Sequence, residues 1–141
     1  MVAPIEYRFK INAYTPQTMP LDRLAKYLNL LASIMGQPQS VHLIGVEGGS
    51  TVPVLAVDWE DDTKVRQRVH DAGHGKGPQE AVAAKNALED YLAQDNAEGA
   101  TLTRSGENIL QFRPHVKPRE AMEFGPFDQP GSLDGVVARV P

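Results

Sequence analysis

The sequence of 141 residues contains no cysteine. Disulfide bonds, thiolate metal sites and cysteine nucleophiles are therefore excluded. A chain without cysteine is typical of a reducing compartment, so the expected location is the cytoplasm.

Long apolar runs are also missing from the sequence. No stretch approaches the roughly 18 consecutive apolar residues that a membrane-spanning helix requires. The N-terminal sequence MVAPIEYRFKINAY carries charges at Glu6, Arg8 and Lys10, and so lacks the apolar centre of a signal peptide. No interaction with a membrane is therefore expected.

The chain has no excess of basic residues. It contains 14 Lys and Arg against 18 Asp and Glu, a formal net charge of −4. This charge gives no general attraction to nucleic acid or anionic lipid, so binding of either needs a local basic patch. The contents of 41% hydrophobic and 23% charged residues are typical of a globular chain, and the length is that of one domain.

Periodic patterns of apolar residues predict an α+β domain over residues 1–112. The expected strands cover residues 5–14, 41–46, 51–57, 100–104 and 108–112, and the expected helices residues 20–36, 61–72 and 78–96. This order predicts a ferredoxin-like β-α-β-β-α-β sandwich, with the helices on one face of an antiparallel sheet and an added C-terminal strand. Such a fold implies no function by itself.

Two helices carry detailed expectations. The first is expected to start at Pro20, to end at Gly36 and to bury a single stripe. The stripe comprises Leu21, Leu24, Leu28, Leu31 and Met35. In the second, Asp61 and Asp62 are expected to supply the N-cap and an acidic first turn.

The strands carry two further expectations. Tyr7 and Phe9 share the alternation of Ile5 and Ile11, which predicts that both aromatic rings face the core. Pro53 has no N–H to donate, so the strand over 51–57 is expected at a sheet edge or to be bulged there.

Residues 113–141 form a Pro- and Gly-rich arm, followed at 136–140 by the pattern of a last strand. The arm is either a tail docked on the domain or the start of a missing second domain. Its apolar residues Phe124, Phe127 and Leu133 are candidates for contacting a partner.

The stretch HDAGHGKGPQE at 70–80 resembles the metalloprotease motif H-E-x-x-H, with Asp71 in place of glutamate. That motif needs a helix to hold both imidazoles on one face. Glycines on either side of His74 break the helix, so no metal site is expected, and no cofactor either. Paired acids such as Glu89 and Asp90 are expected on an exposed helix face, and no catalytic residue is assigned.

The same stretch offers accessible amides at its glycines, the charge of Lys76 and a helix start at Pro78, features that favour an anion. Its spacing matches neither common phosphate-binding motif, and glycines equally serve to cap and turn a chain. On a helical wheel Lys64 and Arg68 fall on one side of the second helix, while Arg66 and His70 fall on the other.

These observations predict a small non-catalytic module, of bacterial or phage type, that mediates protein interaction or assembly. It is expected to self-associate or to bind a protein partner through its sheet edge and its C-terminal arm. The alternative is a nucleic-acid- or phosphate-binding module. The residues of that alternative are Lys64, Arg66, Arg68, Gly73, Gly75, Lys76 and Gly77.

Overall fold

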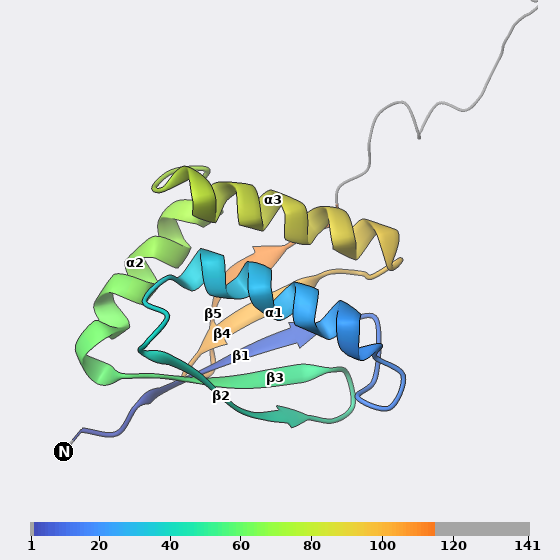
Figure 1. Cartoon of the computed structure of the whole chain (residues 1–141), viewed down its shortest axis with the longest axis horizontal. Coiled ribbons are helices and arrows are strands. Elements are labelled where there is room, and N and C mark those ends of the chain that lie inside the picture. The colour runs from blue at the N-terminus through green and yellow to red at the C-terminus, as the bar shows by residue number, and fades with distance from the viewer. Residues whose placement is uncertain (1, 115–141) are drawn as a thin grey trace, which may run out of the picture.

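A computed structural model describes residues 2–114. These residues form five strands and three α-helices (Figure 1). The strands are β1 (Ile5–Ile11), β2 (Val41–Glu47), β3 (Val52–Val57), β4 (Ala100–Arg104) and β5 (Glu107–Phe112), and the helices are α1 (Leu21–Met35), α2 (Asp62–Gly73) and α3 (Gln79–Gln94). A short 3-10 turn, Trp59–Asp61, leads into α2.

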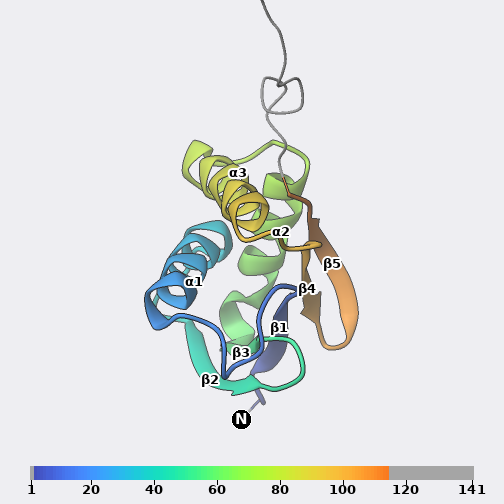
Figure 2. The ribbon, with the colours of Figure 1, turned by 90° about the vertical axis from the view of Figure 1, so that its right-hand side faces the viewer.

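The five strands make one antiparallel sheet in the order β2-β3-β1-β4-β5. The three helices lie together on one side of this sheet, which is strongly twisted (Figure 2). The α+β class predicted from the sequence is thereby confirmed. β1 is the central strand, and β2 and β5 are the two edges.

The central strand supplies the middle of the core. Tyr7, Phe9 and Ile11 are fully buried, whereas Glu6 and Lys10, which alternate with them, are exposed. The period of two in the sequence therefore predicted the buried face of β1 correctly, including both aromatic rings. Phe9 also packs edge-on against Phe112 of β5, with ring centroids 5.5 Å apart.

Helix α1 departs from its predicted stripe at its first residue. Leu21, in the first turn, is 82% exposed, and the residues of α1 that are buried lie further along the helix. The fully or nearly fully buried residues of α1 are Tyr27, Leu31, Ile34 and Met35. Pro20 precedes the helix in an extended conformation, and Gly36 ends it as expected, with its N–H donating to the carbonyl of Ala32.

Both predicted hairpins are present. The turn between β2 and β3 falls at the expected glycines, and the turn between β4 and β5 uses Ser105 and Gly106, both at positive φ. Positive φ at both central residues of a turn matches the twist of the flanking strands. The first strand is shorter than predicted, because β1 ends at Ile11 rather than at residue 14.

The strand that contains Pro53 was expected at a sheet edge, and this prediction was wrong. Its strand β3 lies between β2 and β1, and the bulge falls in β2 between Leu43 and Gly45. The pairing of β3 with β1 is interrupted beyond Val54 and resumes as an isolated bridge at Thr51. An interior strand thus accommodates the proline by giving up part of one ladder, as its missing N–H requires.

The acidic pair at the start of α2 occupies the cap and the first turn as predicted, but neither side chain caps the helix. Asp61 occupies the cap position, but its carboxylate accepts a hydrogen bond from the hydroxyl of Ser40. Asp62 is only 5% exposed and turns toward the sheet. There it accepts hydrogen bonds from the hydroxyl of Tyr7 at 2.7 Å and from the guanidinium of Arg104, whose closest nitrogen lies at 2.7 Å.

Asp62 stays ionised in this buried position. Burial alone raises the pKa of its carboxyl, but the hydrogen bonds from Arg104 and Tyr7 and the charge of Arg104 outweigh burial, and the pKa ends below its ordinary value. Burial, together with the hydrogen bond to Asp62, also raises the pKa of Tyr7. Tyr7 and Arg104 are direct cross-strand partners, so one carboxylate joins α2 to β1 and β4 at the same point.

We expect Gly36→Ala to destabilise the protein by about 1–3 kcal/mol. Gly36 has φ 68° and ψ −163°, a region open essentially to glycine alone, and an added Cβ would lie 2.7 Å from Cδ of Arg68. Gly48→Ala is the matched control, because a Cβ there meets no atom within 4 Å. Urea unfolding of both variants measures the difference, and equal stabilities would contradict the strain at Gly36.

We expect Asp62→Asn to cost about 1–3 kcal/mol at neutral pH, because Arg104 loses its charged partner. The folded state lowers the pKa of Asp62. Its carboxylate therefore stabilises the folded protein above the unfolded pKa, which is near 4, and this stabilisation is lost as the pH falls through the folded pKa. The variant should therefore lose less stability than the wild type between about pH 4 and pH 2. Chemical unfolding across this range tests it, with Asp22→Asn, an exposed acid of α1, as control.

A candidate groove between α2 and β5

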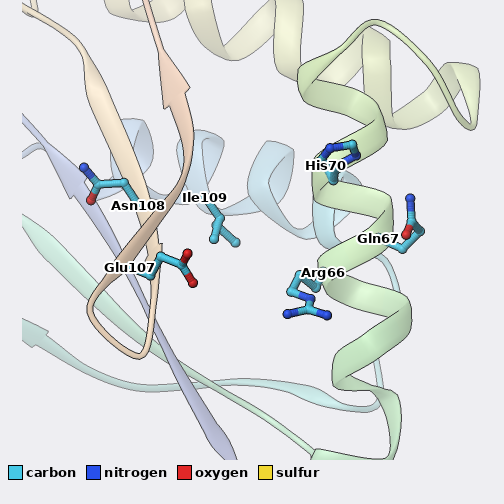
Figure 3. A pocket seen from close by; sticks show the side chains of 6 residues that line it. All are labelled: Arg66, Gln67, His70, Glu107, Asn108 and Ile109. Carbon is cyan, nitrogen blue, oxygen red and sulfur yellow. The ribbon is translucent and has the colours of Figure 1, made fainter.

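A groove of about 440 Å³ runs between helix α2 and the edge strand β5. Three residues of each element line it: Arg66, Gln67 and His70 from α2, and Glu107, Asn108 and Ile109 from β5. Figure 3 shows the side chains of Glu107 and Ile109 directed toward the helix, and that of Asn108 directed away from it. The groove is therefore charged on both walls, with one apolar side chain between them.

Local sequence explains the shape of the groove. Arg66 and His70 are four residues apart, so both lie on the same face of α2. Near the end of α2 an added Cβ on Gly73 would lie 2.9 Å from a methyl group of Leu110, so glycine lets the helix approach β5 there. Opposite this point, the pairing of β4 with β5 shifts between Leu102 and Thr103, which makes a bulge at Ile109.

Some groove side chains are already engaged and others are not. Gln67 donates to the carboxylate of Asp71 at 2.9 Å, and the His70 imidazole lies 3.6 Å from the same carboxylate. Within residues 2–114, no hydrogen bond or ion pair joins the side chain of Arg66, Glu107 or Asn108 to another residue. The charge of Arg66 acts on Asp62, whose pKa it helps to lower, but its guanidinium and the Glu107 carboxylate have no hydrogen-bonded or ion-paired partner in this part of the chain.

The predicted helical wheel holds in the structure. Arg66 and His70 face β5, whereas Lys64 and Arg68 lie on the other side of α2. Lys64 is 3.8 Å from Asp61 and largely exposed. Arg68 donates two hydrogen bonds to the carbonyl of Ser33, at 2.9 and 3.3 Å, and so attaches α2 to the last turn of α1.

The glycine-rich loop caps α2. The N–H groups of His74 and Lys76 both donate to the carbonyl of Asp71, and that of Gly75 donates to the carbonyl of Ala72. Gly77 has φ 86° and lies close to the side chain of Asp71. Of the four loop residues in the anion hypothesis, Gly75 and Lys76 thus have their amides engaged by the helix end. Contact of an anion with Gly73, Gly75, Lys76 or Gly77 stays a prediction.

The two histidines of this stretch lie together without forming a metal cluster. Their ring centroids are 4.5 Å apart, and Nδ1 of His74 lies 2.9 Å from the carbonyl oxygen of His70, at hydrogen-bond distance. In the part of the chain that the structure describes, no three His, Cys, Asp or Glu side chains are arranged to hold a metal ion. The helix ends at Gly73, where the glycines were expected to break it.

One acid placed on an exposed face by sequence is in fact buried. Glu89 is 4% exposed and lies beside Lys85 at 3.1 Å, and it also accepts a hydrogen bond from the N–H of Arg113 at 2.8 Å. Helix α3 thereby holds the end of β5. Lys85 lies one turn away on the same helix, but the N–H of Arg113, which also pairs with the buried carboxylate, lies 24 residues away.

A second surface lies at the opposite edge of the sheet. On β2 the apolar residues Leu43, Ile44 and Val46 are 53%, 54% and 42% exposed. Beside them a small apolar pocket of about 150 Å³ opens between β2, β3 and α1. Its lining residues are Leu28, Leu31, Ala32, Met35, Val41, Leu43 and Leu55.

Sequence reasoning named Arg66 and missed the other wall of the groove. Glu107, Asn108 and Ile109 carry no motif, and only the sheet order shows that their strand is an edge beside α2. The predicted contact residues Phe124, Phe127 and Leu133 of the arm lie outside the described residues.

Comparison with protein-family models, curated proteins and solved structures yields no match. Among residues 2–114, no helix has the length and apolar character needed to cross a membrane. What can be inferred about function therefore rests on the groove and on the β2 edge.

We expect the basic residues of α2 to differ in their contribution to the stability of the fold. Arg68→Ala should lower the free energy of unfolding by about 1–2 kcal/mol, because the carbonyl of Ser33 loses its charged donor. Lys64→Ala and Arg66→Ala should each change it by less than about 0.5 kcal/mol, since both side chains are exposed. Thermal and urea unfolding of the three variants measure this, and a stable Arg68→Ala variant would count against the assignment.

Proposed function

We propose that this domain is a non-catalytic protein-interaction module that self-associates through the edge strand β2. The observation that carries the proposal is the exposure of three apolar side chains, Leu43, Ile44 and Val46, on a strand that pairs with one other strand among residues 2–114. An edge strand presents unpaired N–H and C=O groups, which another strand can pair with.

The β2 edge lacks most features that protect edge strands. Lysine and proline commonly block such pairing, and neither occurs in Val41–Glu47. The bulge between Leu43 and Gly45 is the one protective irregularity on β2. The apolar pocket beside Leu43 adds a recess for an apolar side chain from a bound strand.

The proposed occupant is a second copy of this chain, with its own β2 antiparallel to the first. A twofold axis places the same patch of each copy against the other, so the patch must complement itself. Apolar side chains meet this requirement, whereas a patch of one charge sign would repel its copy. The other edge of the sheet carries Glu107, Asn108 and Gln111 and is less suited to self-pairing.

We also propose a finer description of the fold. Strands β1 to β4 with helices α1 and α3 are a variant of the ferredoxin-like unit, to which α2 and β5 are additions. This proposal is supported by the β-α-β-β-α-β order of those six elements and by the position of β1 between β3 and β4. The additions then account for the groove, since α2 and β5 form its two walls.

We expect the full chain to be a dimer in solution and Ile44→Lys to raise the dimer dissociation constant at least about tenfold, because a lysine at the strand edge opposes pairing. Size-exclusion chromatography with light scattering over a concentration series measures this. Leu21→Lys is the matched control, since Leu21 is more exposed than Ile44 but lies in α1.

Circular dichroism establishes that both variants are folded. A wild-type chain that is monomeric at every concentration would refute self-association. A dimer that persists in Ile44→Lys would assign the contact to a different surface.

A further inference from the structure

The α2–β5 groove combines an open strand edge with a flanking helix. β5 is the last strand of the sheet, so in residues 2–114 no strand pairs with its outer side. Helix α2 meets β5 near Gly73 and Leu110, and the groove opens from there toward Arg66 and Glu107 (Figure 3). A strand edge beside a helix is the setting in which domains bind an extended peptide as an added strand.

The charges of the groove restrict the chemistry of its ligand. Arg66 offers a guanidinium to an anion, with the imidazole of His70 one turn further along the same face. Across the groove Glu107 offers a carboxylate, which requires a cation or a hydrogen-bond donor. Ile109 between them is half-buried and supplies an apolar contact. The complementary ligand therefore carries a carboxylate and a basic or donor group, separated by an apolar stem.

Nucleic acid fits this groove less well than a peptide does. The Glu107 carboxylate lies where a phosphate backbone would have to pass, and like charges repel. Lys64 and Arg68 on the far side of α2 cannot extend the positive surface of Arg66. The groove lining also contains no Phe, Tyr or Trp on which a base would stack.

We propose that this groove binds an extended peptide, which pairs with β5 as a sixth strand and directs a carboxylate side chain to Arg66. In a strand, side chains on one face repeat every ~6.7 Å, which is close to the ~6 Å that separates Arg66 from His70 along α2. A second side chain two residues along the peptide, basic or hydrogen-bond donating, meets Glu107. The bulge at Ile109 sets the register of the added strand.

This site lies on the edge opposite β2, so it does not depend on self-association. An Ile44→Lys variant that is monomeric would still contain the intact groove. Peptide binding is therefore measured on both the wild-type chain and the Ile44→Lys variant, and the two are expected to bind equally. Loss of the dimer with retained peptide binding separates the two proposals.

A random octapeptide display library selected on the full chain is the first experiment. Selected peptides are expected to be enriched in Asp or Glu at one position, with Lys, Arg or a donor residue two positions away. Amide NMR shifts on addition of the best peptide are expected in β5 and along α2. Arg66→Ala should weaken its binding at least about tenfold, because a charge pair loses one partner, whereas Lys64→Ala should leave it unchanged.

Several results would overturn this proposal. These are a selection without an acidic position, NMR shifts confined to β2, or equal effects of Arg66→Ala and Lys64→Ala. Tighter binding of a ten-nucleotide oligouridine than of any selected peptide, lost in Arg66→Ala and steeply dependent on salt, would assign the groove to nucleic acid instead.

Discussion

The buried carboxylate of Asp62 determines how the helical layer sits on the sheet. It accepts hydrogen bonds from Tyr7 of the central strand and from Arg104 of the next strand, which face each other in the register. The first turn of α2 is thus fixed over β1 and β4. Arg66 follows Asp62 by four residues and so lies one turn further along the same side of the helix. The position of Arg66 in the groove wall therefore depends on the contact of Asp62 with Tyr7 and Arg104.

The two edges of the sheet differ in chemistry. β2 exposes apolar side chains next to an apolar pocket, while β5 exposes a charged and amide-bearing surface next to the basic face of α2. A buried apolar contact favours a self-complementary partner, and a groove with separated charges favours a partner of different sequence. Under the two proposals, one small domain offers two surfaces that need not compete for the same partner.

Short-range patterns in the sequence predicted the features that depend on neighbouring residues. The buried face of β1 and the separation of Arg66 from Arg68 follow from spacing, while the two hairpins and the ends of α1 and α2 follow from glycine, proline and cap residues. Features set by distant residues did not follow from these patterns. Asp62 lies in the first turn of α2 as predicted, but its burial against Arg104 depends on a residue 42 positions away. Leu21 matched the apolar stripe of α1 but is 82% exposed. The groove was missed because Glu107 meets α2 only through the order of the strands.

The glycine at the end of α2 has a consequence for recognition. Because Gly73 allows close approach to Leu110, α2 is held against the sheet at both of its ends, by that contact and by Asp62. A helix fixed in this way cannot swing outward without breaking one of the two contacts. Folding of the chain therefore fixes the separation of α2 and β5, and with it the width of the groove. In the proposed binding mode the receptor rearranges little, so the entropy loss of association falls mainly on the peptide.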